Sequence, residues 1–310
     1  MSTLVECVPN FSEGRDPYKV GQIAATIRTV PGVYVLDFHR DPDHNRSVMT
    51  LVGSHETVSE AALRVVGQAV ALIDLNRHQG EHPRIGAADV VPFIPVRGVT
   101  LEDCVRIAHE TGKEIYRRFQ VPVYFYEAAA LQPGRENLEN IRRGGFEELK
   151  SQAVDDPSRQ PDVGGPQLHP TAGATAVGAR HLLIAFNINL DSSDRKVAQE
   201  IARKIRSSGG GLPALKAMGV LLNSRSVGGR AGQAQVSMNL TDFEKTSLAE
   251  AFRVVEREAA RLGASIASSE LVGLIPQKAL AGTSPEALKI AGFHPLKILE
   301  NKLAEVLPPG

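Results

Sequence analysis

The segment Arg77–Asp89, RHQGEHPRIGAAD, is the richest part of the chain in side chains that could carry acid–base chemistry. An imidazole with a pKa of about 6.5 is the side chain best suited to move protons at neutral pH. His82 lies in the middle of this segment, next to Glu81, which could raise its pKa. Arg84 could bind a carboxylate. We therefore expect a proton-transfer site here, with His82 as general acid or base.

The same segment contains the string His78-x-x-Glu81-His82, which matches a zinc-protease motif. That motif requires a continuous helix, which places both histidines on one face. Gly80 weakens such a helix, and Pro83 disfavours helical backbone at the residue before it. The pattern therefore predicts a tight loop that binds no metal.

Two shorter polar clusters could add binding groups. The cluster between Asp37 and Arg46 is typical of an exposed turn, but its two end residues lie closest to predicted strands and could reach a cleft. Residues 10–15, NFSEGR, predict a strand-to-helix turn. In that turn Asn10 or Ser12 could cap the helix, or the helix amides could bind an anion.

Hydrophobic periodicity predicts the elements that carry these clusters. The expected helices cover residues 16–29, 56–73, 101–119, 193–207 and 241–262, and Thr241 with Glu244 forms a capping-box pattern for the last of them. The expected strands cover residues 3–8, 33–38, 46–52, 90–96, 121–126, 181–190, 215–222, 232–240 and 264–269. The order β-α-β-β-α-β occurs in residues 3–96 and again from residue 181. We predict an α+β fold of two ferredoxin-like (split βαβ) subdomains with a cleft between them.

Two polar rows lie on central strands of the second predicted subdomain. Asn187 and Asn189 alternate with apolar residues in one strand, and Gln235, Ser237 and Asn239 alternate with them in another. Solvation could explain these rows. Because amides can both donate to and accept from a polar heterocycle, we favour a wall that faces a ligand.

The stretch 151–180 is rich in Pro and Gly. It is either a plain linker or a loop that wraps the cleft between the subdomains.

Composition narrows the class of protein. The 310 residues include 35 basic and 35 acidic side chains, and this balance disfavours a nucleic-acid binder. The two cysteines are not clustered, which indicates a reducing compartment and buried structural thiols. The N-terminus does not resemble a signal peptide, and no apolar run approaches the roughly 18 residues of a membrane span. We expect a cytoplasmic enzyme.

Six separated blocks resemble the glutamate formiminotransferase family, which is the formiminotransferase part of formiminotransferase-cyclodeaminase. They occur in order and span residues 3 to about 282 of this chain: VECVPNFSEGR (5–15), DFHRDPDHNRSVMTLVG (37–53), RHQGEHPRIGAADVVPFIPVRGVT (77–100), HLLIAFNINL (181–190), QVSMNLTDF (235–243) and ELVGLIPQKAL (270–280).

The resemblance implies transfer of a formimino group from N-formimino-L-glutamate to tetrahydrofolate, late in histidine degradation. The products would be 5-formimidoyltetrahydrofolate and L-glutamate, with tetrahydrofolate as co-substrate and no metal. The catalytic histidine of the family corresponds to His82 in GEHPRIG. Its folate-contacting segment corresponds to Gly164, Gly165, Pro166, Gln167, Leu168, His169, Pro170, Thr171, Ala172 and Gly173.

The chemistry agrees with these residues. The leaving amine must be protonated, and a general acid such as His82 contributes roughly 10²–10⁴-fold. The cationic amidine of the donor calls for an acid such as Asp37 or Glu81, and its carboxylates call for arginine. Vertebrate-type members carry an acid in place of His39 and a tryptophan in place of Ala172.

Two alternatives remain open at the level of sequence. One is an N-formylglutamate–tetrahydrofolate formyltransferase, whose donor differs by O for NH. The other is a non-catalytic regulatory module that binds folate or an amino acid.

We expect subdomains at 1–180 and 181–282 and a helical tail at 283–310. The expected partners are a second copy in a homodimer and a separate cyclodeaminase, with no nucleic acid or membrane.

Overall fold

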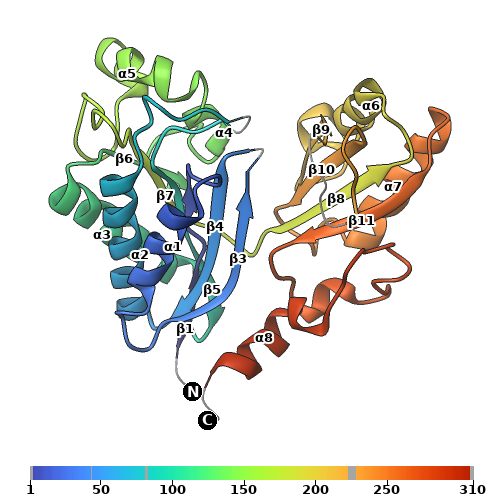
Figure 1. Cartoon of the computed structure of the whole chain (residues 1–310), viewed down its shortest axis with the longest axis horizontal. Helices are drawn as coiled ribbons and strands as arrows, with labels where there is room; N and C mark the ends of the chain where they lie inside the picture. The colour runs from blue at the N-terminus through green and yellow to red at the C-terminus, as the bar shows by residue number, and fades with distance from the viewer. Residues whose placement is uncertain (1–2, 43, 81–82, 223–227, 308–310) are drawn as a thin grey trace. The chain divides into compact units, whose positions relative to one another are not determined.

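The computed structural model describes residues 3–42, 44–80, 83–222 and 228–307. The chain divides into two compact units, Met1–His181 and Leu182–Gly310. Each unit contains one sheet with helices packed on it (Figure 1). The predicted α+β class is therefore confirmed. In the described part of the chain, no helix has the length and apolar character needed to cross a bilayer.

The sheet of the first unit is mixed. Its strands are β1 (Leu4–Cys7), β2 (Asn10–Phe11), β3 (Tyr34–Asp41), β4 (Arg46–Gly53), β5 (Ala88–Arg97), β6 (Val123–Glu127) and β7 (Thr175–Ala179). Strands β1 and β2 both pair with β4 on one side and with β5 on the other, in antiparallel register. Strand β3 extends the sheet beyond β4, and β7 joins β5 and β6 in parallel register.

Three helices of the first unit, α1 (Pro17–Ile27), α2 (His55–Leu72) and α3 (Leu101–Phe119), lie along one face of this sheet (Figure 1). Alternate strand residues such as Met49, Leu51 and Phe93 belong to the buried core of this unit. Two further helices, α4 (Leu138–Ile141) and α5 (Gly145–Asp155), follow β6, and a 3₁₀ turn covers Pro157–Arg159.

The second unit has the order β-α-β-β-α-β. Its elements are β8 (Ile184–Leu190), α6 (Arg195–Ile205), β9 (Leu215–Leu221), β10 (Ala234–Leu240), α7 (Leu248–Arg261) and β11 (Ile266–Val272). The four strands are antiparallel in the order β11-β8-β10-β9, so β8 and β10 are central neighbours. Short 3₁₀ turns cover Ser207–Gly209, Gln277–Leu280 and Pro295–Lys297, and α8 covers Leu299–Val306.

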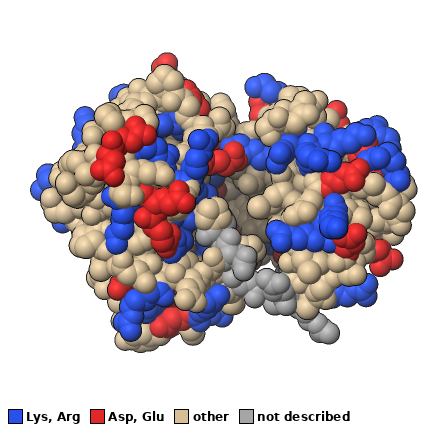
Figure 2. Space-filling model, turned by 90° about the horizontal axis from the view of Figure 1, so that it is seen from above, with Lys and Arg blue, Asp and Glu red and all other residues tan. Residues whose placement is uncertain are grey.

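Several charged side chains on the helices of the second unit form ion pairs. Figure 2 shows Lys and Arg gathered over this unit with Asp and Glu among them. Lys204 lies 3.1 Å and Arg261 3.0 Å from the same carboxylate of Glu258. A second carboxylate, that of Glu200, lies 2.6 Å from Arg261.

Three local predictions were wrong. Residues 151–180 are not a plain linker, because they contain the end of α5 and the central strand β7. Helix α7 begins at Leu248 with Ser247 as its N-cap, not at Thr241. Helix α1 is capped by Asp16, whose side chain accepts hydrogen bonds from Tyr18 N and Lys19 N, rather than by Asn10 or Ser12.

Candidate active site

The Arg77–Asp89 segment connects α2 to β5. Two of its predicted functional residues, Glu81 and His82, lie outside the described residues. Helix α2 ends at Leu72, and residues 78–80 have no helical structure. The described part of the zinc-like string is thus in a loop. Among the described residues, no three His, Cys, Asp or Glu side chains are grouped as a metal site would require.

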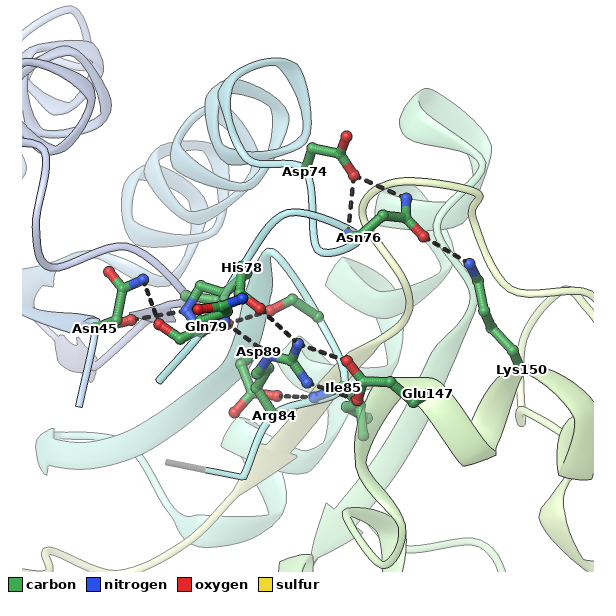
Figure 3. Close-up of polar contacts among 12 residues, drawn as sticks. Asn45, Asp74, Asn76, His78, Gln79, Arg84, Ile85, Asp89, Glu147 and Lys150 are labelled. Atoms are coloured by element: carbon green, nitrogen blue, oxygen red, sulfur yellow. Dashed lines mark hydrogen bonds and ion pairs between the residues drawn. The ribbon is translucent and has the colours of Figure 1, made fainter. Parts of the chain in front are cut away.

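Arg84 connects this loop to α5. Its Nε–H donates to Nδ1 of His78 at 2.8 Å, and its two terminal nitrogens donate to the Glu147 carboxylate at 2.8 and 2.7 Å (Figure 3). The Arg84 side chain is only 12% exposed, whereas that of Glu147 is 63% exposed. This guanidinium is therefore already engaged by one carboxylate and one imidazole.

The hydrogen bonds of His78 define its tautomer. Because Nδ1 accepts from Arg84, the ring proton is on Nε2, which donates to the Asn45 carbonyl at 3.0 Å. Burial lowers the pKa of His78 below its usual value of 6.5, and the Arg84 charge lowers it further, while the Asn45 carbonyl acts in the opposite direction. His78 is thus held neutral as a structural link.

Asn45 joins three segments of the first unit. Its side chain accepts from Gly14 N at 2.9 Å and donates to the Gln79 carbonyl at 2.9 Å, while its own carbonyl accepts from His78. The backbone of Asn45 is left-handed, with φ of 48°, and the residue is 7% exposed. Asparagine tolerates this conformation better than most residues. It therefore fixes the loop entering residues 81–82 to the turns after β2 and β3.

The predicted folate-contacting segment lies against the same loop. The Thr171 carbonyl accepts a hydrogen bond from Leu75 N at 2.8 Å, and the Ala172 carbonyl accepts one from Ala87 N at 2.9 Å. In the opposite direction, Ala174 N donates to the Ile85 carbonyl at 2.9 Å. A Cβ added at Gly86 would lie 2.0 Å from the Ala174 carbonyl oxygen. The close approach of the two chains therefore requires glycine at this position.

The rest of that segment differs in exposure along its length. Gly164, Gly165, Gln167 and Pro170 are exposed, while Leu168 and Ala172 are buried. The His169 imidazole accepts from the Ala172 amide at 3.0 Å. Burial lowers the pKa of His169. The residues available to a ligand in this segment are therefore mainly those before Leu168.

A buried charge cluster lies beside the loop, and one of its members, Arg142, was missed in the sequence. Arg142, which ends α4, forms an ion pair with Asp89, whose other oxygen accepts from Ile85 N at 2.7 Å. Arg46 donates a hydrogen bond to the Asn10 side chain. Burial and then the Arg142 charge lower the pKa of Arg46 to about 10, while the charges of Asp89 and Asp41 act to raise it. No local pattern connects Asp89 with a residue 53 positions later.

The predicted donor-binding residue Asp37 lies in β3. The register pairs Asp37 with Thr50 and Asp41 with Arg46, on the face opposite Met49 and Leu51. Asp37 and Arg46 are thus on one sheet face but at different ends of the β3–β4 pair. Burial raises the pKa of Asp41, but hydrogen bonds from His44, which lies 2.6 Å away, outweigh it and lower the pKa to about 2.

The two polar rows of the second unit are adjacent, as the strand order required. Gln235 pairs with Asn189 and Ser237 with Asn187 across β8 and β10, and Asn239 lies opposite Ala185. Asn189 and Gln235 are buried, Asn187 and Ser237 are half-buried, and Asn239 is exposed.

The buried part of these rows takes part in a continuous chain of hydrogen bonds. Gln235 donates to Asn189 at 2.8 Å, Asn189 donates to Ser268 at 3.0 Å, and Ser268 donates to the Gly228 carbonyl at 2.6 Å. These amides therefore satisfy one another, which leaves Asn187 and Ser237 as the half-buried groups of the rows that a ligand could approach.

Comparison with known proteins assigns the chain to a family. A family model described as "Formiminotransferase domain, N-terminal subdomain" matches residues 4–180, and one described as "Formiminotransferase domain" matches residues 185–286. The chain belongs to the formiminotransferase family. The resemblance expected from the six sequence blocks is therefore confirmed.

Several curated relatives of this formiminotransferase-family chain cover nearly its whole length. A "Glutamate formimidoyltransferase" of Streptococcus pyogenes serotype M1 is 43% identical over 304 residues, which is 98% of this chain and 99% of the relative. One of Thermoplasma acidophilum is 42% identical and covers 97% of each chain. The "Formimidoyltransferase-cyclodeaminase" of Sus scrofa is 44% identical over 90% of this chain but only 51% of its own length.

Proposed function

We propose that this chain is a glutamate formimidoyltransferase. It moves the formimino group from N-formimino-L-glutamate to tetrahydrofolate and yields 5-formimidoyltetrahydrofolate and L-glutamate in histidine degradation. The observation that carries the proposal is the identity of 43% and 42% with two relatives of that name over nearly the full length of each chain. Tetrahydrofolate is the co-substrate.

The reaction needs one proton donor at a defined place. N5 of tetrahydrofolate attacks the amidine carbon, and the N5 proton passes to the His82 imidazole as the tetrahedral centre forms. The bond from this carbon to the glutamate nitrogen then breaks, and that nitrogen takes up a proton as it leaves. We assign this proton to His82, because an imidazolium can supply it near neutral pH.

The described residues on both sides of His82 support this assignment. The chain that enters is held at Gln79 by Asn45, and the chain that leaves is held at Ile85 by Asp89. Arg84 is occupied by Glu147 and His78, so its role in this proposal is to position the loop. The substrate carboxylate then needs a different arginine.

The remaining predicted binding residues are assigned to the formimino donor and to tetrahydrofolate. In the first unit, Asp37 is an acid for the amidinium, Arg46 is a cation for a carboxylate, and the Gly164–Gly173 segment faces the folate. In the second unit, Asn187, Ser237 and Asn239 offer amide and hydroxyl groups to the substrates. Asn189 and Gln235 hold these strands through their mutual hydrogen bond.

We further propose a cytoplasmic homodimer that passes its product to a cyclodeaminase. The animal relatives carry the cyclodeaminase in their name, and this chain spans about half of their length. Gel filtration with light scattering tests the dimer. Conversion of the product by an added cyclodeaminase tests the second step.

A donor comparison tests the proposed reaction. Purified protein receives tetrahydrofolate with either N-formimino-L-glutamate or N-formyl-L-glutamate, and released L-glutamate is measured. We expect turnover with the formimino donor and little with the formyl donor. Turnover of the formyl donor alone would establish the formyltransferase instead, and folate binding without turnover of either donor would indicate a regulatory module.

A further inference from the structure

One row of side chains crosses all four strands of the second sheet, which lie side by side in Figure 1. The register places Asn187 of β8 opposite Glu270 of β11 on one side and opposite Ser237 of β10 on the other. Ser237 in turn lies opposite Met218 of β9. Residues directly opposite in neighbouring antiparallel strands have Cβ atoms about 4.5–5.5 Å apart. The four side chains therefore form one continuous row on one face of the sheet.

This row lies on the sheet face opposite the core of the second unit. Ile188, the residue after Asn187, belongs to that buried core. A Cβ added at Gly219, the residue after Met218, would lie 2.2 Å from Gln199 N of α6. Because successive residues of a strand point to opposite faces, Asn187 and Met218 point away from the core and from α6.

Exposure rises along the row from β11 to β9. Glu270 is 7% exposed, Asn187 and Ser237 are half-buried, and Met218 is 59% exposed. Among the described residues, neither the Asn187 amide nor the Ser237 hydroxyl has a hydrogen-bond partner, whereas Gln235 in the next row is bonded. An amide and a hydroxyl can each donate and accept. The middle of the row therefore has free hydrogen-bonding capacity beside an exposed apolar side chain.

We propose that Asn187, Ser237 and Met218 bind the pterin ring of tetrahydrofolate. The pyrimidine part of this ring presents donors and acceptors along one edge, which match an amide and a hydroxyl. Its flat aromatic face suits the thioether of Met218. N-formimino-L-glutamate has charged groups and no flat ring, so it would leave Met218 without a contact. The inference rests on the proposed function, which makes tetrahydrofolate a substrate.

Three variants test the site: Ser237→Ala, Asn187→Ala and Met218→Gln. The matched control is Leu221→Gln, because Leu221 belongs to the same strand, is 38% exposed and points to the other face. Loss of one hydrogen bond or of the sulfur contact should weaken tetrahydrofolate binding by about two- to ten-fold. We expect this loss in each of the three variants and no change in Leu221→Gln.

Isothermal titration with tetrahydrofolate alone gives the dissociation constant independently of turnover. Competition with 6-methyltetrahydropterin and with p-aminobenzoyl-L-glutamate then assigns the loss to one end of the folate molecule. We expect the three variants to weaken the pterin competitor. The affinity for p-aminobenzoyl-L-glutamate and the KM for the formimino donor should stay as in the wild type.

A folding defect is distinguished by urea denaturation. Ser237→Ala removes a hydroxyl that bonds to none of the described residues, so its midpoint should match that of the wild type. The proposal is wrong if the folded variants bind tetrahydrofolate as tightly as Leu221→Gln. It is also wrong if only p-aminobenzoyl-L-glutamate or the formimino donor is affected. Weaker pterin binding in a protein that does not turn over N-formimino-L-glutamate would instead contradict the proposed reaction alone.

Discussion

The Nε–H of Arg84 donates to Nδ1 of His78 across 2.8 Å. This bond fixes the proton of the His78 imidazole on Nε2 and places a permanent positive charge beside the ring. His78 is therefore a poor base at neutral pH, which separates its role from the one proposed for His82 in the same sequence string.

The first prediction concerns the titration of His78. Burial lowers the pKa of His78 below 6.5, and the charge of Arg84 adds to this effect against the Asn45 carbonyl, so less than half of the rings should be protonated at pH 6.5. Nitrogen-15 NMR should show the Nε2–H tautomer, and Arg84→Gln should raise the pKa. Because the folded-state pKa is depressed, the stabilising contribution of His78 should be lost as the pH falls below 6.5. A His78 that titrates above 6.5 in the wild type would contradict this geometry.

The second prediction concerns catalysis. His82→Ala should lower kcat by at least about two orders of magnitude, the lower range for loss of a general acid, with tetrahydrofolate binding nearly unchanged. His78→Ala should reduce kcat less, because its ring supports the loop. Steady-state kinetics with both variants distinguishes the roles. The reverse order of effects would identify His78 as the acid.

The third prediction concerns Asn45. Asn45→Gly keeps a residue that accepts φ of 48° but removes the hydrogen bonds to Gly14 and Gln79. It should lower the free energy of unfolding by about 1–3 kcal/mol. Asn45→Ala should cost about 1 kcal/mol more because of left-handed strain. Urea denaturation measures both. Equal stability of the two variants would show that the backbone conformation does not matter.

The fourth prediction concerns Glu6, in β1 at 5% exposure. Burial raises its pKa from 4.5 to about 7, against an opposing effect of Arg180. The protonated form is therefore favoured in the folded state. Its contribution to stability should be complete below pH 4.5 and lost as the pH rises through about 7. With each tenfold change in proton affinity worth about 1.4 kcal/mol, the loss should approach about 3 kcal/mol.

The comparison with Glu6→Gln isolates this effect from other titrating groups. The variant cannot ionise at this position, so it should equal the wild type at pH 5 and be more stable than it at pH 8.5. Denaturant midpoints at several pH values provide the measurement. Parallel pH profiles for the two proteins would mean that Glu6 ionises freely.

The fifth prediction contrasts two glycines. Gly86→Ala would place Cβ 2.0 Å from the Ala174 carbonyl oxygen, so it should separate the loop from the 170–174 segment and lower stability. Gly21→Ala in α1 meets no atom within 4 Å and should stabilise the protein by up to about 1 kcal/mol. Thermal unfolding of the pair tests both. Destabilisation by Gly21→Ala would contradict the open surface seen at α1.

Local patterns were sufficient for much of the secondary structure. Helix α3 has the bounds 101–119 that its periodicity predicts, because an amphipathic stripe and a capping box at Thr100 act over a few residues. The capping pattern at Thr241 failed for a tertiary reason. Its amide and hydroxyl both donate to the Ala214 carbonyl, at 2.9 and 3.1 Å, so the helix begins only at Leu248.

Strand β7 is a second element that the local sequence does not predict. Its sequence TAVGA is short and small, and nothing local separates it from the Gly-rich stretch around it. It is a strand because β5 and β6 lie on either side and supply hydrogen-bonding partners.

The sequence by itself determined the family and the α+β class, because motifs and hydrophobic periods are local properties of the chain; the role of His82 stays a prediction. Only the tertiary structure decided which arginine has which partner. Arg84 faces Glu147, 63 positions away, and Arg142 faces Asp89, 53 positions away. Such pairings depend on how separate elements pack, and no spacing along the chain encodes them.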